Sequence, residues 1–237
     1  MKELGIYIHI PFCKQKCIYC DFVSYANKEE QIEKYVKYLL REIEEVAKGI
    51  KLGKKEIVIK TIYIGGGTPS FIHEKYIEEV LQCIFRNYTV KEDAEITIEI
   101  NPGTVTEEKL QTYQRNGINR LSIGMQSTNN AILKQLGRVH NFQQFLNTYQ
   151  LARELKFHNI NIDLMIGLQN QNIEEELEKV LTLQAEHLSV YSLMIEENTP
   201  LYNMVENKKY QLPKEETERA MYWSVKNKLE ENRISTL

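Results

Sequence analysis

The chain has 237 residues, which is long enough for one large α/β domain. Apolar residues make up 42% and charged residues 27%, and the net charge is only −3, so the composition excludes a sequence-wide attraction to nucleic acid or to anionic membranes. No run approaches the roughly 18 apolar residues of a membrane span, and the N-terminus lacks the apolar core of a signal peptide. We therefore expect a cytoplasmic protein that has no nucleic-acid partner.

Strand and helix patterns alternate along most of the chain. Each apolar, β-branched run is followed by a polar stretch that carries apolar residues at helical spacing, as at Tyr35, Leu39 and Ile43. This alternation favours a parallel sheet with helices outside it, in an α/β fold that is either doubly wound or a barrel. The predicted strands are 5–10, 61–64, 95–100, 120–124, 161–166 and 187–193. The predicted helices are 28–48, 73–86, 106–115, 142–156 and 173–184.

The strand and helix rhythm stops near residue 194. Thr199-Pro200 indicates a turn, and Pro213 precedes a strongly helical stretch at 214–231. We expect an α/β core over residues 1–200 and a C-terminal helical region over 201–237.

Three of the four cysteines lie within eight residues, as Cys13, Cys17 and Cys20 in a C-x3-C-x2-C loop directly after the first strand. Three thiolates on one short loop bind three corners of an iron–sulfur cubane and leave the fourth iron open. The alternative is a structural zinc site, which needs a fourth ligand such as His9. Cys83 stands alone on the apolar face of a predicted helix and is interpreted as a small buried hydrophobe.

A glycine-rich turn, GGGTPS at 65–70, follows the second strand. Successive glycines let a backbone approach a ligand closely, and the absence of GK[ST] excludes a P-loop. Polar residues also occur at or beyond the ends of later strands, where α/β barrels place their sites. Each of these alone is also compatible with a solvated or structural role. They are Glu99, Gln126, Arg138 and Asp163.

The cysteine loop, with YIHIPF at 7–12 before it and Asp21-Phe22 after it, resembles the radical SAM superfamily. Within it, the longer match is similar to the oxygen-independent coproporphyrinogen III oxidase branch, which includes radical SAM heme chaperones. The resemblance implies a partial (β/α)6 TIM-like barrel with a C-terminal helical extension. Residues 1–200 are then the radical SAM core, and 201–237 begin a C-terminal helical region whose remainder is absent, so the chain is expected to be C-terminally truncated.

The resemblance implies two cofactors, a [4Fe–4S] cluster on the three loop cysteines and S-adenosylmethionine (SAM) on its open iron. Tyr7 and Tyr19 then flank this SAM, and Gly66 and Glu99 contact its polar groups. A further set matches positions that hold a second SAM in the oxidases: Gly67, Thr68, Gln126, Arg138 and Asp163. Met194 matches a backbone contact near the adenine. No catalytic acid–base pair is implied.

Two features favour the heme-chaperone branch. Phe22 stands where the oxidases usually carry a further cysteine, and the first ligand is already residue 13. This interpretation implies heme or another tetrapyrrole as cargo, a heme-acceptor protein, and an electron donor such as a flavodoxin or ferredoxin. The alternatives are an oxygen-independent coproporphyrinogen III oxidase in porphyrin biosynthesis and a zinc-stabilised structural module.

Overall fold

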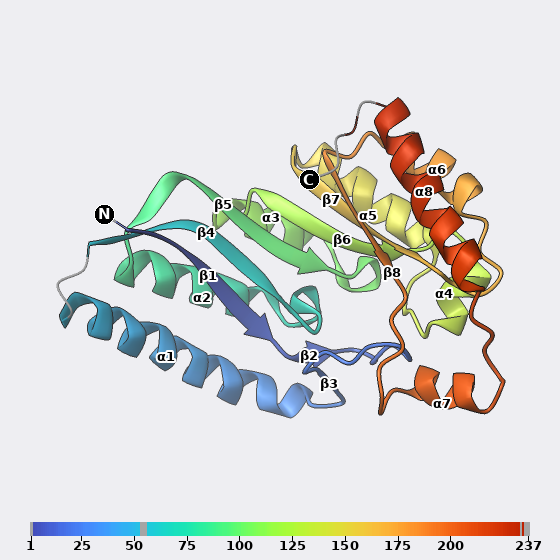
Figure 1. Ribbon diagram of the computed structural model, residues 1–237. Coiled ribbons are helices and arrows are strands. Elements are labelled where there is room, and N and C mark those ends of the chain that lie inside the picture. The colour runs from blue at the N-terminus through green and yellow to red at the C-terminus, as the bar shows by residue number, and fades with distance from the viewer. Residues whose placement is uncertain (1, 53–55, 233, 235–237) are drawn as a thin grey trace.

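A computed structural model describes residues 2–52, 56–232 and 234 of the chain. Its main sheet has six parallel strands in the order β1-β4-β5-β6-β7-β8. Since spatial order follows chain order, each crossover leads to the next strand, and the sheet curls into a half-barrel (Figure 1). The predicted α/β fold with a partial (β/α)6 barrel is confirmed. The strands are β1 (Lys2–Ile10), β4 (Ile57–Gly66), β5 (Val90–Ile100), β6 (Arg120–Gln126), β7 (Ile160–Ile166) and β8 (His187–Ser192).

Helices cover the convex face of the sheet (Figure 1). Five of them follow strands and correspond to predicted helices: α1 (Ile32–Leu52), α2 (Glu74–Asn87), α3 (Glu107–Arg115), α5 (Phe142–Glu154) and α6 (Ile173–Leu181). The final predicted helix is α8 (Glu215–Glu231), which packs against α6. Across the described residues, no helix combines the length and apolar character needed to cross a bilayer.

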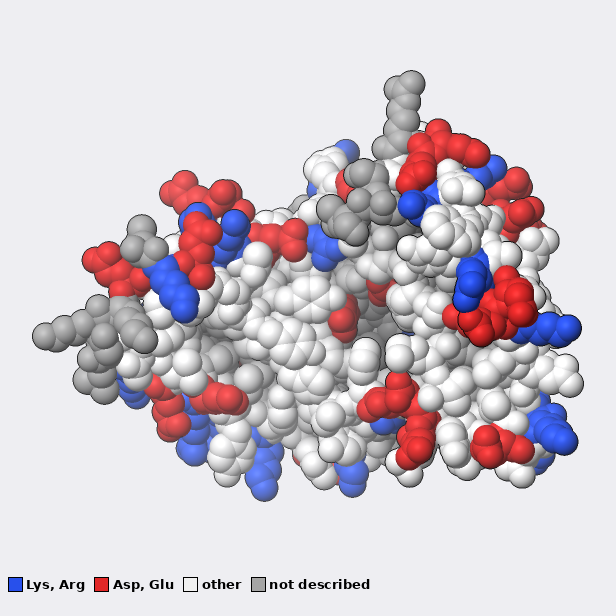
Figure 2. Space-filling model, viewed as in Figure 1, with Lys and Arg blue, Asp and Glu red and all other residues white. Residues whose placement is uncertain are grey.

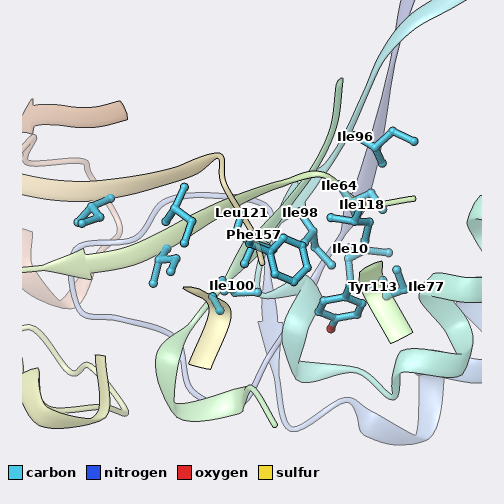
Figure 3. Close-up of a cluster of buried hydrophobic side chains, with 14 of the residues drawn as sticks. Ile10, Ile64, Ile77, Ile96, Ile98, Ile100, Tyr113, Ile118, Leu121 and Phe157 are labelled. Atoms are coloured by element: carbon cyan, nitrogen blue, oxygen red, sulfur yellow. The ribbon is translucent and has the colours of Figure 1, made fainter. Parts of the chain in front are cut away.

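The hydrophobic core lies between the sheet and these helices. Ile98 and Ile100 of β5 and Leu121 of β6 pack with Tyr113 of α3 and with Phe157, all buried (Figure 3). Fully burying one such aliphatic side chain stabilises the fold by about 1.5–3 kcal/mol. Because side chains alternate along a strand, the residues between these isoleucines face the concave side of the sheet. The same packing therefore places polar residues such as Glu99 inside the half-barrel.

The structure contains short elements that the sequence analysis did not predict. A two-stranded ribbon pairs β2 (Phe12–Cys13) with β3 (Tyr25–Ala26), and a helix α4 (Asn130–Gln135) follows β6. The turn predicted at Thr199-Pro200 is present over residues 196–199, where the Thr199 N–H donates to the Glu196 carbonyl (3.3 Å), but the helix that follows it, α7 (Pro200–Glu206), was not predicted. The Thr199 hydroxyl accepts a hydrogen bond from the Tyr202 N–H, and Pro200 stands in the first turn, where a missing N–H costs nothing.

Helix boundaries follow the local signals closely. Thr106 caps α3 by accepting from the Lys109 N–H, and Gly117 after it has φ +84°, a conformation that glycine adopts without strain. The first helix begins later than predicted, since residues 29–31 form a 3-10 turn before α1. Positions 233 and 235–237 of the expected C-terminal region lie outside the described residues.

Candidate functional site

A cavity of about 500 Å³ opens at the carboxyl ends of the strands, a size typical of small-molecule sites. Figure 2 shows this face of the molecule hollowed near its centre, with acidic side chains in and around the hollow. The cavity brings together every predicted ligand and cofactor residue except Tyr7. Those residues are Cys13, Cys17, Cys20, Tyr19, Gly66, Gly67, Thr68, Glu99, Gln126, Arg138, Asp163 and Met194.

The cysteine loop is held in place by segments far away in the sequence. Cys13 is buried in β2, while Cys17 and Cys20 are partly buried. The Ile18 N–H donates to the Leu136 carbonyl (3.1 Å), beyond α4. The Ile18 carbonyl accepts from the N–H of Leu201 in α7 (2.9 Å). The two unpredicted helices therefore anchor the loop that carries the three thiols.

The surroundings of the thiols suit sulfur atoms that carry negative charge. An Nη1 proton of Arg138 points to Cys17 Sγ (3.6 Å), and the Thr68 hydroxyl donates to Cys13 Sγ (3.5 Å). The buried Arg138 Nε has no hydrogen-bond partner among the described residues. Burial raises the pKa of the Cys20 thiol, which a bound metal would reverse by holding the thiolate. The Arg138 guanidinium, with its spare Nε donor, thus suits an anionic cluster bound to the thiols and a small molecule bound to that cluster.

Gly67 makes room for the loop. A Cβ at this position would lie 3.0 Å from both Cys13 Sγ and the Phe12 carbonyl oxygen, closer than real Cβ atoms normally approach. A side chain here would therefore push the glycine-rich turn and the Cys13 loop apart by a few tenths of an ångström. The two sequence motifs are in contact in the folded chain.

A preformed single-ion site is not found in the part of the chain that the structure describes, where no three His, Cys, Asp or Glu side chains are placed to hold one metal ion. His9, the candidate fourth zinc ligand, contacts the Tyr7 hydroxyl (3.0 Å) through Nδ1 and the Val23 carbonyl (2.8 Å) through Nε2. Both nitrogens are thus occupied within the protein. A zinc site that uses His9 would therefore have to break one of these two contacts, since tetrahedral zinc needs four donors.

Glu99 lies at the end of β5 with both carboxylate oxygens partnered. Oε1 accepts from the Tyr63 hydroxyl (2.8 Å), and Oε2 accepts from the Gly66 N–H (3.0 Å). Burial raises the pKa of Glu99, while these two hydrogen bonds oppose that rise. Glu99, which interrupts the apolar alternation of β5, therefore lines the cavity with its carboxylate fixed by two hydrogen bonds.

Asp163 of β7 is a second carboxylate in the same cavity. Oδ1 accepts from the amide of Asn161 (2.6 Å) and from the hydroxyl of Ser122 (3.3 Å). Burial and the nearby charge of Glu99 raise the pKa of Asp163 to about 6. Two acidic groups facing one cavity suit a ligand that brings hydroxyl or ammonium donors.

The far wall of the cavity comes from β6 and β8. Gln126, the last residue of β6, has φ +69°, which is strained for a non-glycine residue. Its side-chain oxygen accepts from the hydroxyl of Tyr191 on β8 (2.5 Å). Arg138 donates through Nη2 to the Gly124 carbonyl (2.8 Å), so it spans from β6 to the cysteine loop.

The aromatic and methionine candidates differ in placement. Tyr19 lines the cavity and packs against the smaller buried cluster, which includes Leu136 and Leu201. Met194 lies at the cavity mouth, 68% exposed. Tyr7 is 58% exposed and lies outside the lining, but its ring stacks on Tyr63, with centroids 6.1 Å apart.

Sequence analysis missed Tyr63 and Tyr191. Both are tyrosines on strands, where an aromatic side chain is ordinary, and no local pattern marks the hydroxyl as part of a site. Only the folded sheet identifies them: Tyr63 lies beside Glu99 of the neighbouring strand β5, and Tyr191 on β8 reaches across β7 to Gln126 of β6.

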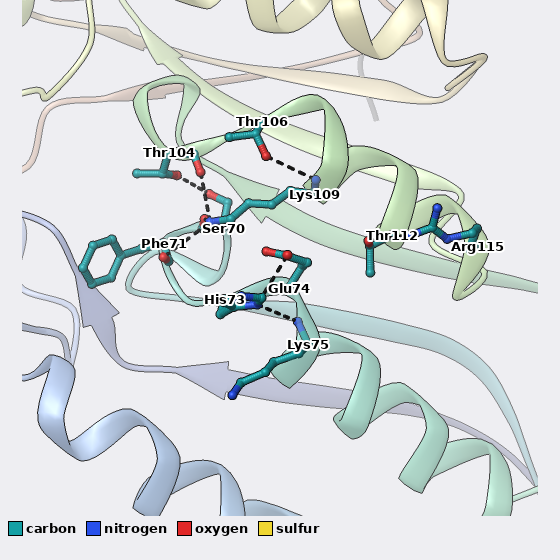
Figure 4. A network of polar contacts seen from close by, with 10 residues as sticks. All are labelled: Ser70, Phe71, His73, Glu74, Lys75, Thr104, Thr106, Lys109, Thr112 and Arg115. Atoms are coloured by element: carbon teal, nitrogen blue, oxygen red, sulfur yellow. Dashed lines mark hydrogen bonds and ion pairs between the residues drawn. The ribbon is translucent and has the colours of Figure 1, made fainter.

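Lys109 of α3 holds together the loops that follow β4 and β5 (Figure 4). Its ammonium donates to the carbonyls of Ser70 (2.5 Å) and Thr104 (3.2 Å). The Ser70 hydroxyl in turn accepts from the Asn101 N–H (3.0 Å) and contacts the Thr104 hydroxyl (2.7 Å). Burial lowers the pKa of Lys109. The glycine-rich turn thus rests on a polar network beneath the cavity.

His140 is buried between two strand ends. Nδ1 faces Asn101 Oδ1 (3.1 Å), and Nε2 faces the Met125 carbonyl (3.3 Å). Burial and the nearby Arg138 lower the pKa of His140 to about 3, so the imidazole is neutral at physiological pH. We interpret it as a structural link between the ends of β5 and β6.

Comparison of the sequence with known proteins shows the family to which the chain belongs. Residues 7–183 match the Radical SAM superfamily, and the chain belongs to that superfamily. It is 43% identical to the heme chaperone HemW of Escherichia coli (strain K12) over 204 residues, 84% of this chain and 53% of that protein. It is 38% identical to HemW of Bacillus subtilis (strain 168) over 233 residues, 96% of this chain and 60% of that protein.

A solved structure agrees with these relatives. The coproporphyrinogen III oxidase HemN of Escherichia coli, described as a radical SAM enzyme, superposes with a TM-score of 0.83 at 26% identity. The match covers 96% of this chain and 52% of that one. The predicted resemblance to the coproporphyrinogen oxidase-like branch is confirmed, and the chain spans slightly more than half the length of these relatives.

Proposed function

We propose that this chain binds a [4Fe–4S] cluster through Cys13, Cys17 and Cys20 and binds SAM in the adjoining cavity. The observation that carries the proposal is the convergence of three thiols, a glycine-rich turn and two carboxylates on one cavity of about 500 Å³. When bound, the cluster supplies the electron for reductive cleavage of the SAM sulfonium.

The residues of the chain have separable tasks in this proposal. The Gly66 turn and Glu99 offer polar partners to the amino acid part of SAM, and Asp163 accepts from hydroxyl donors. Arg138 offsets the thiolate charge beside Cys17. Helix α7, from the region we assign to the start of the C-terminal extension, steadies the cysteine loop through Leu201.

The whole protein's role is proposed as heme chaperoning, the delivery of heme to an acceptor protein. The names of the two HemW relatives support this, as does Phe22, which is 66% exposed at the cavity mouth. An oxygen-independent coproporphyrinogen III oxidase is the second candidate, favoured by the HemN superposition. The cytoplasmic location and the flavodoxin or ferredoxin donor belong to the same proposal.

Anaerobic reconstitution with iron and sulfide tests the cofactor proposal. We expect about four irons and four sulfides per chain, loss of the cluster in Cys17→Ser, and normal loading in the control Cys83→Ser, since Cys83 is buried in α2. Stoichiometric zinc without sulfide would refute it. A heme titration followed by absorbance and an anaerobic assay for protoporphyrinogen then separate chaperone from oxidase.

A further inference from the structure

Tyr63 lies on β4 two residues before the glycine-rich turn, and its hydroxyl donates to Glu99 Oε1 at 2.8 Å. The Gly66 N–H donates to the other oxygen at 3.0 Å. We propose that Tyr63 is a positioning residue, which clamps the Glu99 carboxylate together with Gly66 in the orientation that receives SAM. This inference rests on the proposed SAM site and adds a residue to it.

The strand register explains why the two groups meet. Tyr63 is the register partner of Thr97 on β5, and Glu99 lies two residues further along that strand, on the same face. On the other side, Tyr63 is paired with Tyr7 of β1, and the two rings stack with an interplanar angle of 27°. The Tyr63 ring is therefore held between two strands, which leaves its hydroxyl little freedom to leave Glu99.

Gly65 gives an independent indication that this contact is built into the fold. A Cβ at this position would lie 2.8 Å from Tyr63 Cε1 and 2.9 Å from Glu99 Cδ. A side chain here would force the phenol and the carboxylate apart. The first glycine of the turn therefore serves the Tyr63–Glu99 pair, while Gly66 supplies the second donor.

The clamp matters because the surroundings disfavour a charged Glu99. Burial raises the pKa of Glu99, and the carboxylate of Asp163 on β7 repels it. On β1, His9 lowers the pKa of Glu99 while the Tyr7 phenol lies nearby. The Tyr63 hydroxyl supplies the hydrogen bond that most lowers the pKa of Glu99, so removing it raises that pKa further and frees the carboxylate to turn.

The test measures SAM affinity of the cluster-loaded protein by anaerobic titration calorimetry between pH 6 and 9. Tyr63→Phe keeps the ring and its stacking but removes the donor. We expect about tenfold weaker SAM binding at pH 7.5, because hydrogen bonds to charged groups are the strong ones. The pH at which binding is half-maximal should also move upward. The control Tyr88→Phe, which removes a hydroxyl that donates to the Ile43 carbonyl far from the cavity, should leave both unchanged.

A double-mutant cycle shows whether Tyr63 acts through Glu99. In a Glu99→Gln background, Tyr63→Phe should change SAM affinity by less than about twofold, because the charged acceptor is gone. Equal losses in both backgrounds, or an unchanged affinity and pH profile in the single variant, would overturn the inference. If the unsubstituted, cluster-loaded protein binds no SAM, the proposed function itself fails. That outcome differs from a failure of the Tyr63 inference, in which the unsubstituted protein still binds SAM.

Discussion

Replacing the buried carboxylate of Asp163 should stabilise the cluster-free protein at neutral and alkaline pH. Asp163→Asn keeps the size of the side chain and an oxygen that accepts from Asn161 and Ser122. What it removes is a negative charge that is buried and lies near the charge of Glu99.

The structure sets the magnitude and the sign of this effect. The pKa of Asp163 rises from 3.8 to about 6 on folding, and one pKa unit corresponds to about 1.4 kcal/mol. Well below pH 3.8 the carboxyl is protonated in both the folded and unfolded states, so it costs nothing. Between pH 4 and 6 the unfolded state ionises first, and the free energy of unfolding falls as pH rises. Above pH 6 the full cost applies, at most about 3 kcal/mol.

Urea unfolding of the reduced, cluster-free protein at pH 4, 5, 6, 7 and 8 measures this. The free energy of unfolding of Asp163→Asn should exceed that of the natural protein by less than about 1 kcal/mol at pH 4 and by about 2 kcal/mol at pH 7, and the difference should stay level at pH 8. Asp93→Asn, at an exposed carboxylate of β5, should change the free energy of unfolding by less than about 0.5 kcal/mol. A gain that is equal at all pH values, or no gain at pH 8, would refute the electrostatic reasoning. SAM affinity should fall in the same variant, since sites often trade stability for function.

Two further substitutions probe the support of the cavity. Lys109→Met should lower the free energy of unfolding by about 1–3 kcal/mol, because it leaves buried carbonyls without their donor. The control is Lys37→Met, on the exposed face of α1. Equal losses in the two variants would contradict the role of Lys109. Gly67→Ala should reduce iron bound on reconstitution by more than about half, because its Cβ would crowd Cys13 Sγ. Gly49→Ala, where a Cβ meets nothing within 4 Å in helix α1, should load normally and be more stable by about 0.5–1 kcal/mol.

The sequence by itself predicted the architecture, and it singled out most of the residues that the structure brings together in the cavity. Runs of β-branched residues and helices at 3.6-residue spacing are local signals, and so the parallel α/β order could be predicted. The cysteine spacing is also local, because three ligands on eight residues lie together in almost any fold of that loop. Glu99 and Asp163 were visible because an acidic residue inside an apolar strand needs an explanation.

Only the tertiary structure decided which uncharged side chains contact the polar residues of the site. The register of β4 on β5 sets Tyr63 near Glu99, and Tyr191 lines the cavity and reaches Gln126 across the intervening strand β7. Both placements depend on contacts between residues far apart in sequence. The helix at 200–206 was not predicted, for a similar reason. Seven residues form a stable helix only when packing supports them, and here α7 packs its buried Leu201 and donates to the cysteine loop. The thiols themselves could be found in the sequence, but the parts that hold them in place come from contacts between distant segments of the chain.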